Sequence, residues 1–174
     1  IVHHCRKPEL KSQGDTFRKM CGITGFITEN NTYDREKVIN DMMQRIYSRG
    51  PDEAGCYCDD TACLGMRRLS IIGLENGKQP IENEDHTLVL VYNGELYNYP
   101  ELKKELIEKG HVFTTDTDSE VILHGYEEYG PDLLNQLRGM FSFAIWNKEK
   151  KIMFLARDMF GIKPLFYGKK GKES

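Results

Sequence analysis

The residues with the clearest chemistry are Met20, Cys21 and Gly22, which stand side by side in the chain. If Cys21 is the first residue of a mature chain, its α-amine titrates at about pH 8 and can take the thiol proton, directly or through a water. Such a cysteine carries its own general base and needs no partner histidine. For this tripeptide alone, an ordinary buried strand cysteine after a methionine is the alternative.

Residues 1–19 decide whether that chemistry is available. They combine mixed charge with scattered proline and glycine, and they lack a sustained apolar period. We therefore expect a disordered leader, tag or propeptide, or translation from upstream of a start at Met20. A peptide bond on Cys21 removes its basic amine, so we expect an inactive catalyst while residues 1–20 are attached.

Residues 20–174 are long enough to form one domain with a buried core. Apolar alternation predicts strands and helical spacing predicts helices. Strands are expected at 21–28, 55–58, 61–66, 88–92, 141–146 and 152–156, with a turn and a last strand across 161–167; helices are expected at 34–47, 100–110, after 116–120 to 129, and from 131 to 139. Strands outnumber helices, and the helices are grouped, which favours an α+β fold with mainly antiparallel sheets.

Three local signals concern residues that could do chemistry. The glycine of Asn93-Gly94-Glu95 permits a tight turn and a close approach of backbone to a ligand after the 88–92 strand. Asp118 or Ser119 is the expected N-cap of the next helix. Arg67-Arg68 ends a strand, and the simplest interpretation is a pair of solvated surface charges.

Charge and hydropathy exclude several classes of protein. The formal net charge is −3, and because residues 1–19 contribute +3, residues 20–174 carry −6. An acidic domain gives no reason to expect nucleic acid as a partner. No apolar run approaches a membrane span and no segment resembles a signal peptide. We expect a cytoplasmic protein that does not contact membranes.

The five cysteines are odd in number and form no obvious framework, which suits a reducing compartment. Cys56 and Cys58, with Cys63 nearby, could suggest a metal site. Neither a histidine nor a second cysteine pair completes four ligands around them, so we expect no metal.

Six short motifs occur in one order along most of the chain. They are Met20-Cys21-Gly22-Ile23-Thr24-Gly25, Arg49-Gly50-Pro51-Asp52, Arg68-Leu69-Ser70-Ile71, Asn93-Gly94-Glu95-Leu96-Tyr97-Asn98, Thr117-Asp118-Ser119-Glu120 and Arg157-Asp158 followed by Gly161-Ile162-Lys163-Pro164-Leu165. Together they resemble the N-terminal glutaminase domain of glutamine-dependent asparagine synthetases, the class II amidotransferases. The resemblance spans residues 20–167.

The resemblance implies an N-terminal-nucleophile hydrolase fold, a four-layer αββα sandwich of two mainly antiparallel sheets. It also implies that Cys21 attacks the side-chain amide of L-glutamine, forms a glutamyl thioester and releases ammonia. The amide of Asn93 and the backbone N–H of Gly94 would form the oxyanion hole, where one such donor is worth about 3 kcal/mol.

The same resemblance assigns a pocket for free glutamine. Arg68 would bind the α-carboxylate, for which a guanidinium suits bidentate contact. Asp118 would pair with the ammonium, and Glu95 lies beside it. Arg49 would support the site, in a loop that has Ser48 where the family often has histidine. The pocket would also be lined by Leu69, Ser70, Ile71 and Ile72.

The resemblance also limits what this chain can do. We expect it to stop short of the usual end of such domains, and it has no loop like the Ser-Gly-Gly-x-Asp-Ser of an ATP-using synthetase domain. ATP and magnesium are expected only for that separate domain, in cis or in trans. The open alternatives are another amide-forming synthetase as the acceptor, and a silent binding module with Cys21 blocked. A homodimer also stays open.

Overall fold

The computed structural model describes residues 20–29, 32–69 and 77–169. The expected leader 1–19 lies outside these residues. The elements, in chain order, are β1 (Gly22–Ile27), α1 (Arg35–Arg45), β2 (Glu53–Cys58), β3 (Ala62–Arg68), β4 (Ile81–Glu82), β5 (Leu88–Leu96), α2 (Tyr99–Glu108), α3 (Asp118–Tyr129), the 3-10 helix η1 (Gly130–Asn135), β6 (Gly139–Asn147) and β7 (Ile152–Arg157).

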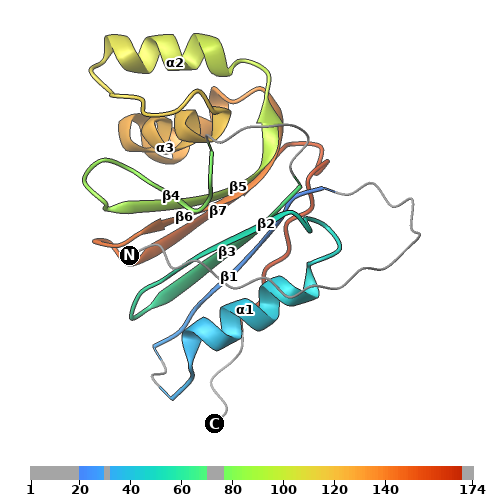
Figure 1. The fold of residues 1–174 in the computed structure, drawn as a ribbon. Helices are drawn as coiled ribbons and strands as arrows, with labels where there is room; N and C mark the ends of the chain where they lie inside the picture. The colour runs from blue at the N-terminus through green and yellow to red at the C-terminus, as the bar shows by residue number, and fades with distance from the viewer. Residues whose placement is uncertain (1–19, 30–31, 70–76, 170–174) are drawn as a thin grey trace.

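Two antiparallel sheets form the centre of the molecule, which confirms the predicted fold class (Figure 1). One sheet has the strand order β1-β3-β2 and the other β4-β5-β6-β7. Helix α1 covers the outer face of the first sheet, α3 covers the outer face of the second, and α2 packs against α3. The result is a four-layer αββα sandwich.

Strand alternation divides the core into layers, because successive side chains of a strand point to opposite faces of its sheet. On β5, Leu88, Leu90 and Tyr92 pack toward α2 and α3. The intervening Val89 and Val91 pack toward the other sheet. On that sheet, Ala62, Leu64 and Met66 of β3 face inward, whereas Cys63 joins Ile39 and Met43 of α1 on the outer face.

Three local expectations need correction. Asn93-Gly94-Glu95 forms no turn: it continues β5, because β6 pairs with it as far as Leu96 opposite Gly139. The short helix after Pro131 ends at Asn135, and Gly139 begins β6. Residues 164–169 follow the predicted turn but form no strand.

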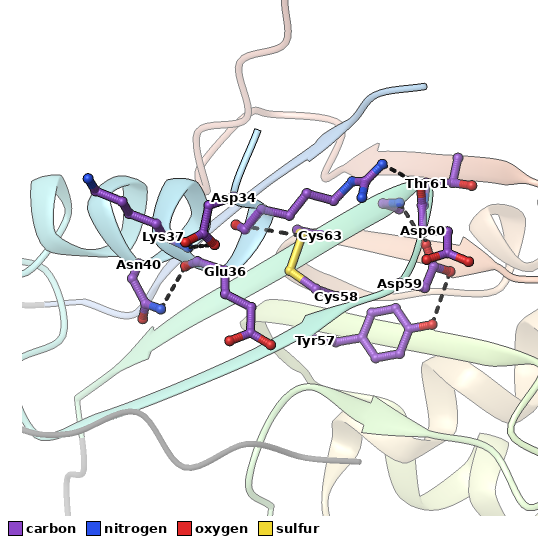
Figure 2. The surroundings of a disulfide bond; sticks show 12 residues. Asp34, Glu36, Lys37, Asn40, Tyr57, Cys58, Asp59, Asp60, Thr61 and Cys63 are labelled. Atoms are coloured by element: carbon purple, nitrogen blue, oxygen red, sulfur yellow. Dashed lines mark hydrogen bonds between the residues drawn. A yellow bond between two sulfur atoms is a disulfide. The ribbon is translucent and has the colours of Figure 1, made fainter. Parts of the chain in front are cut away.

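The cysteines also differ from expectation. Cys58 and Cys63 lie opposite each other in the β2–β3 register and are joined by a disulfide (Figure 2). The expectation that these cysteines form no framework was wrong, because the pairing partner of Cys58 follows from strand register rather than from spacing. The remaining cysteine of the group, Cys56, is buried and takes no part in this disulfide.

Asp59 closes the turn beside this disulfide and links the two sheets. Its carboxylate accepts hydrogen bonds from the N–H groups of Thr61 and Ala62, both at 2.7 Å, and from the Tyr57 hydroxyl at 3.0 Å. It also accepts from the indole N–H of Trp146 on β6, at 2.7 Å.

Among the described residues, no helix is both long and apolar enough to cross a membrane.

Candidate functional site

Cys21 lies just before β1 and contacts the apolar layer between the two sheets. It is half-buried, with a free thiol, and packs on the inter-sheet cluster that includes Val91 of β5. Arg49, which follows α1, donates from Nε to the Cys21 carbonyl at 3.4 Å. Gly22 permits this approach, since a Cβ there would lie 3.3 Å from Cδ of Arg49.

The predicted oxyanion donors lie on β5, in the facing sheet. Asn93 is buried, and alternation places its side chain on the same face as Val89 and Val91, the face that packs against the cluster containing Cys21. Gly94 is required by a close approach, because a Cβ there would lie 2.5 Å from the Met140 carbonyl oxygen. The two sheets thus direct Cys21 and Asn93 into one layer.

Asp118 is anchored to β5 on both sides of Asn93-Gly94-Glu95. Its Oδ2 accepts a hydrogen bond from the Tyr92 hydroxyl at 2.7 Å and from the Leu96 N–H at 3.0 Å. Burial and the Asp118 carboxylate raise the pKa of Tyr92, so its hydroxyl stays a donor. Asp118 is the first residue of α3, and Thr117 is the N-cap, one residue earlier than predicted.

Arg68 approaches the start of α3 from the other sheet. Its Nη1 donates to the Gly77 carbonyl at 3.2 Å and lies 3.5 Å from Oε2 of Glu53. Gly77 in turn touches Thr117, since its ideal Cβ position lies 2.8 Å from the threonine methyl group. Gly77 therefore lies between Arg68, the predicted partner of the glutamine carboxylate, and the N-cap residue of the helix that carries Asp118.

The neighbouring Arg67 is a buried structural residue, so the expectation that it is a solvated surface charge was wrong. It is buried on the α1 side of its sheet, with its guanidinium carbon 4.5 Å above the Tyr47 ring. Its Nε donates to the Gly50 carbonyl at 3.0 Å. A Cβ on Gly50 would lie 2.4 Å from the Arg67 carbonyl, so the loop closes on this strand only with glycine. Strand alternation was the signal that could have separated the two arginines.

The other predicted pocket residues are placed less directly. Leu69 is half-buried just after β3, and Glu95 is exposed at the end of β5. Ser70, Ile71 and Ile72 lie outside the described residues.

Two surface hollows of about 540 and 430 Å³ lie along α2, away from Cys21. Side chains that could together ligate a metal ion also lie elsewhere, on and beside α3.

The comparison with protein families gives the class of this domain. Residues 20–174 match the family described as "Glutamine amidotransferase domain". The chain therefore belongs to the glutamine amidotransferase domain family, in agreement with the arrangement of two packed antiparallel sheets with a cysteine at the start of β1.

Curated proteins similar to this chain include asparagine synthetases. The chain is 48% identical over 151 residues to asparagine synthetase [glutamine-hydrolyzing] 1 of Bacillus subtilis, covering 85% of this chain and 24% of that protein. It is 43% identical to asparagine synthetase [glutamine-hydrolyzing] of Zea mays, covering 86% of this chain and 25% of that one. The chain thus spans about a quarter of the length of these relatives and matches their amidotransferase part.

A search of solved structures found glutamine phosphoribosylpyrophosphate amidotransferase from B. subtilis, in complex with ADP and GMP. It is 30% identical, with a TM-score of 0.47, and covers 56% of this chain and 23% of that one.

Proposed function

We propose that the domain hydrolyses the side-chain amide of L-glutamine through a thioester on Cys21. The observation that carries this proposal is that Cys21 packs on the inter-sheet cluster and that Asn93 lies on the β5 face lining the same layer, while the Asp118 carboxylate is anchored to β5 at Leu96. Membership of the glutamine amidotransferase family supports glutamine as the substrate.

In the proposed reaction the thiol proton passes to the free α-amine of Cys21, and the sulfur attacks the amide carbon of glutamine. The tetrahedral oxyanion accepts hydrogen bonds from the Asn93 amide and the Gly94 N–H. Collapse breaks the carbon–nitrogen bond, and ammonia leaves with the proton held by the amine. Water then hydrolyses the glutamyl thioester, which yields glutamate and restores the thiol.

Two oppositely charged side chains recognise the α-carboxylate and the α-ammonium group of glutamine. The Arg68 guanidinium binds the α-carboxylate and Asp118 binds the ammonium. Both side chains are half-buried and already held by protein partners, so little freedom is lost when glutamine binds. Arg49 supports the site by holding the Cys21 carbonyl.

We further propose that the released ammonia passes to an ATP-dependent synthetase domain, with asparagine as the product. Support comes from the 48% identity to a glutamine-hydrolysing asparagine synthetase. A different amide-forming synthetase is the alternative acceptor, and co-expression of each candidate with this chain would separate them by the product formed.

The test compares three proteins: a chain beginning at Cys21, the same chain with Cys21→Ala, and the full chain beginning at Ile1. We expect glutamate release by the first protein alone. Cys56→Ala is the matched control, because it removes a buried cysteine that the mechanism does not use. Activity that survives Cys21→Ala would refute the mechanism, and activity in the full chain would refute the role of the free amine.

A further inference from the structure

A second polar cluster lies on the later half of α3 and on the segment that follows α2. His124 and Glu127 are three residues apart on α3, so they share one side of that helix. His111 follows Gly110, where the chain leaves α2. The two imidazole rings lie with centroids 5.2 Å apart, and none of these residues belongs to the glutamine site.

Both imidazoles present the same nitrogen to the same carboxylate oxygen. Oε2 of Glu127 lies 2.7 Å from Nδ1 of His124 and 3.7 Å from Nδ1 of His111. One ligand atom from each of the three residues lies within 4.8 Å of the others. Ligands bound about 2.0–2.2 Å from a common ion are separated by distances of this size.

Each of these side chains also has a polar neighbour on its outer side. Nε2 of His111 lies 3.3 Å from Glu128, and Nε2 of His124 lies 3.7 Å from Glu120. Nδ1 of His124 donates a hydrogen bond to Oε2 of Glu127 at 2.7 Å, so an ion that binds Nδ1 would displace this proton. The other oxygen of Glu127 accepts a hydrogen bond from Asn83 at 2.6 Å.

The surroundings favour a positive charge at this point. Carboxylate oxygens of Glu84 and Glu120 lie 3.8 Å and 3.7 Å from Nε2 of His124. Lys109 is already paired with Glu128 at 2.9 Å. His124 is buried, whereas the side chains of His111 and Glu127 are 17% and 22% exposed, so an ion can enter from solvent.

We propose that His111, His124 and Glu127 form a binding site for a divalent transition-metal ion of the Zn²⁺ class. Two imidazole nitrogens and one carboxylate oxygen are the donors that such ions prefer, with the remaining positions filled by water. The ion would tie the segment after α2 to α3, the helix that carries Asp118. The site is independent of the proposed glutaminase reaction.

The test is calorimetric titration of Zn²⁺ into the full chain carrying His3→Ala, His4→Ala and Cys5→Ala, which removes competing ligands outside the described residues. In this background we compare His111→Ala, Glu127→Gln and the control His86→Ala. His86 forms a similar histidine–carboxylate pair, 3.0 Å from Glu82, with no second imidazole paired to that carboxylate among the described residues. Circular dichroism checks that each variant is folded, and Co²⁺ absorption identifies nitrogen and oxygen ligation.

We expect saturable binding that weakens about tenfold or more in His111→Ala and in Glu127→Gln and is unchanged in His86→Ala. Zn²⁺ should also raise the Tm of the background protein but not that of folded His111→Ala. His111 is partly exposed, so its variant keeps the test decisive if Glu127→Gln unfolds. Absence of binding, equal binding in His111→Ala, or a thiolate band in the Co²⁺ spectrum would overturn the proposal.

Discussion

The two ends of helix α3 carry two polar sites that are built differently. At its start, Asp118 is held by groups of β5 and lies beside residues of recognisable motifs. In its later half, His124 and Glu127 meet His111 from another segment, and no motif marks them. The first site combines strand and helix ends around Cys21, the proposed nucleophile, whereas the second combines imidazoles and carboxylates. We therefore expect substitutions at the first to change catalysis and substitutions at the second to change stability.

The largest expected effect is the loss of kcat on substitution of Asn93, which is compared with the substitution of Asn83. Asn93→Ala, in a chain beginning at Cys21, should lower kcat about a hundredfold or more, because one oxyanion donor is lost. The measurement is steady-state glutamate release. A kcat within about threefold of the parent protein would remove Asn93 from the oxyanion hole.

Asn83→Ala is the matched substitution at the other end. Asn83 is buried, donates to Glu127 and accepts from the Leu88 N–H at 2.8 Å. Its loss leaves buried groups unpaired and should cost about 1–3 kcal/mol in the free energy of unfolding. Urea unfolding measures this cost, and kcat should be unchanged. A fall in kcat matching that of Asn93→Ala would abolish the distinction between the two sites.

A second prediction compares the effects on KM for glutamine of two substitutions at the start of α3. Asp118→Ala should raise KM for glutamine by about tenfold or more, since it removes the partner of the substrate ammonium. Tyr92→Phe removes only one of the two donors that hold Asp118 and leaves the Leu96 N–H in place. Its KM should therefore rise less, with kcat little changed. An equal KM for Asp118→Ala and the parent would exclude Asp118 from the pocket.

A smaller effect concerns the pH dependence of stability at Glu120. Burial opposes ionisation, but hydrogen bonds from the N–H groups and hydroxyls of Thr114 and Thr115 lower the pKa of this carboxyl. The stabilisation is complete above the unfolded pKa, about 4.3, and is lost as pH falls through the lower folded pKa.

Glu120→Gln should accordingly be less stable than the parent at pH 7, with a difference that narrows on acidification below about pH 4. Urea unfolding in EDTA at several pH values provides the measurement. A difference that stays constant across this range would mean that ionised Glu120 does not contribute as described.

Much of the fold could be predicted from apolar spacing. The hairpin of β6 and β7 and the paired strands β2 and β3 lie where alternation placed them, because half-buried strands need one apolar face. The expected turn at Asn93-Gly94-Glu95 was wrong for a physical reason. Gly94 permits a close approach to the neighbouring β6 backbone, and sequence alone does not show whether a glycine serves a turn or a strand contact.

The two adjacent arginines show how far the site could be predicted. Sequence motifs selected Arg68 and left Arg67 as a surface charge. Alternation on β3 turns Arg67 toward Gly50 and Tyr47, where it is buried, and turns Arg68 toward the start of α3. The choice between faces depends on which face each layer covers, and this becomes visible only once the layers are assembled.

The sequence by itself determined the fold class, the strand alternation and the identity of Cys21, Asn93, Arg68 and Asp118 as residues to consider, because these depend on local patterns and ordered motifs. Only the tertiary structure decided that Cys58 pairs with Cys63, and that His111 meets His124 and Glu127. Register and packing bring such groups together across gaps in the chain, and no spacing along the sequence encodes that proximity.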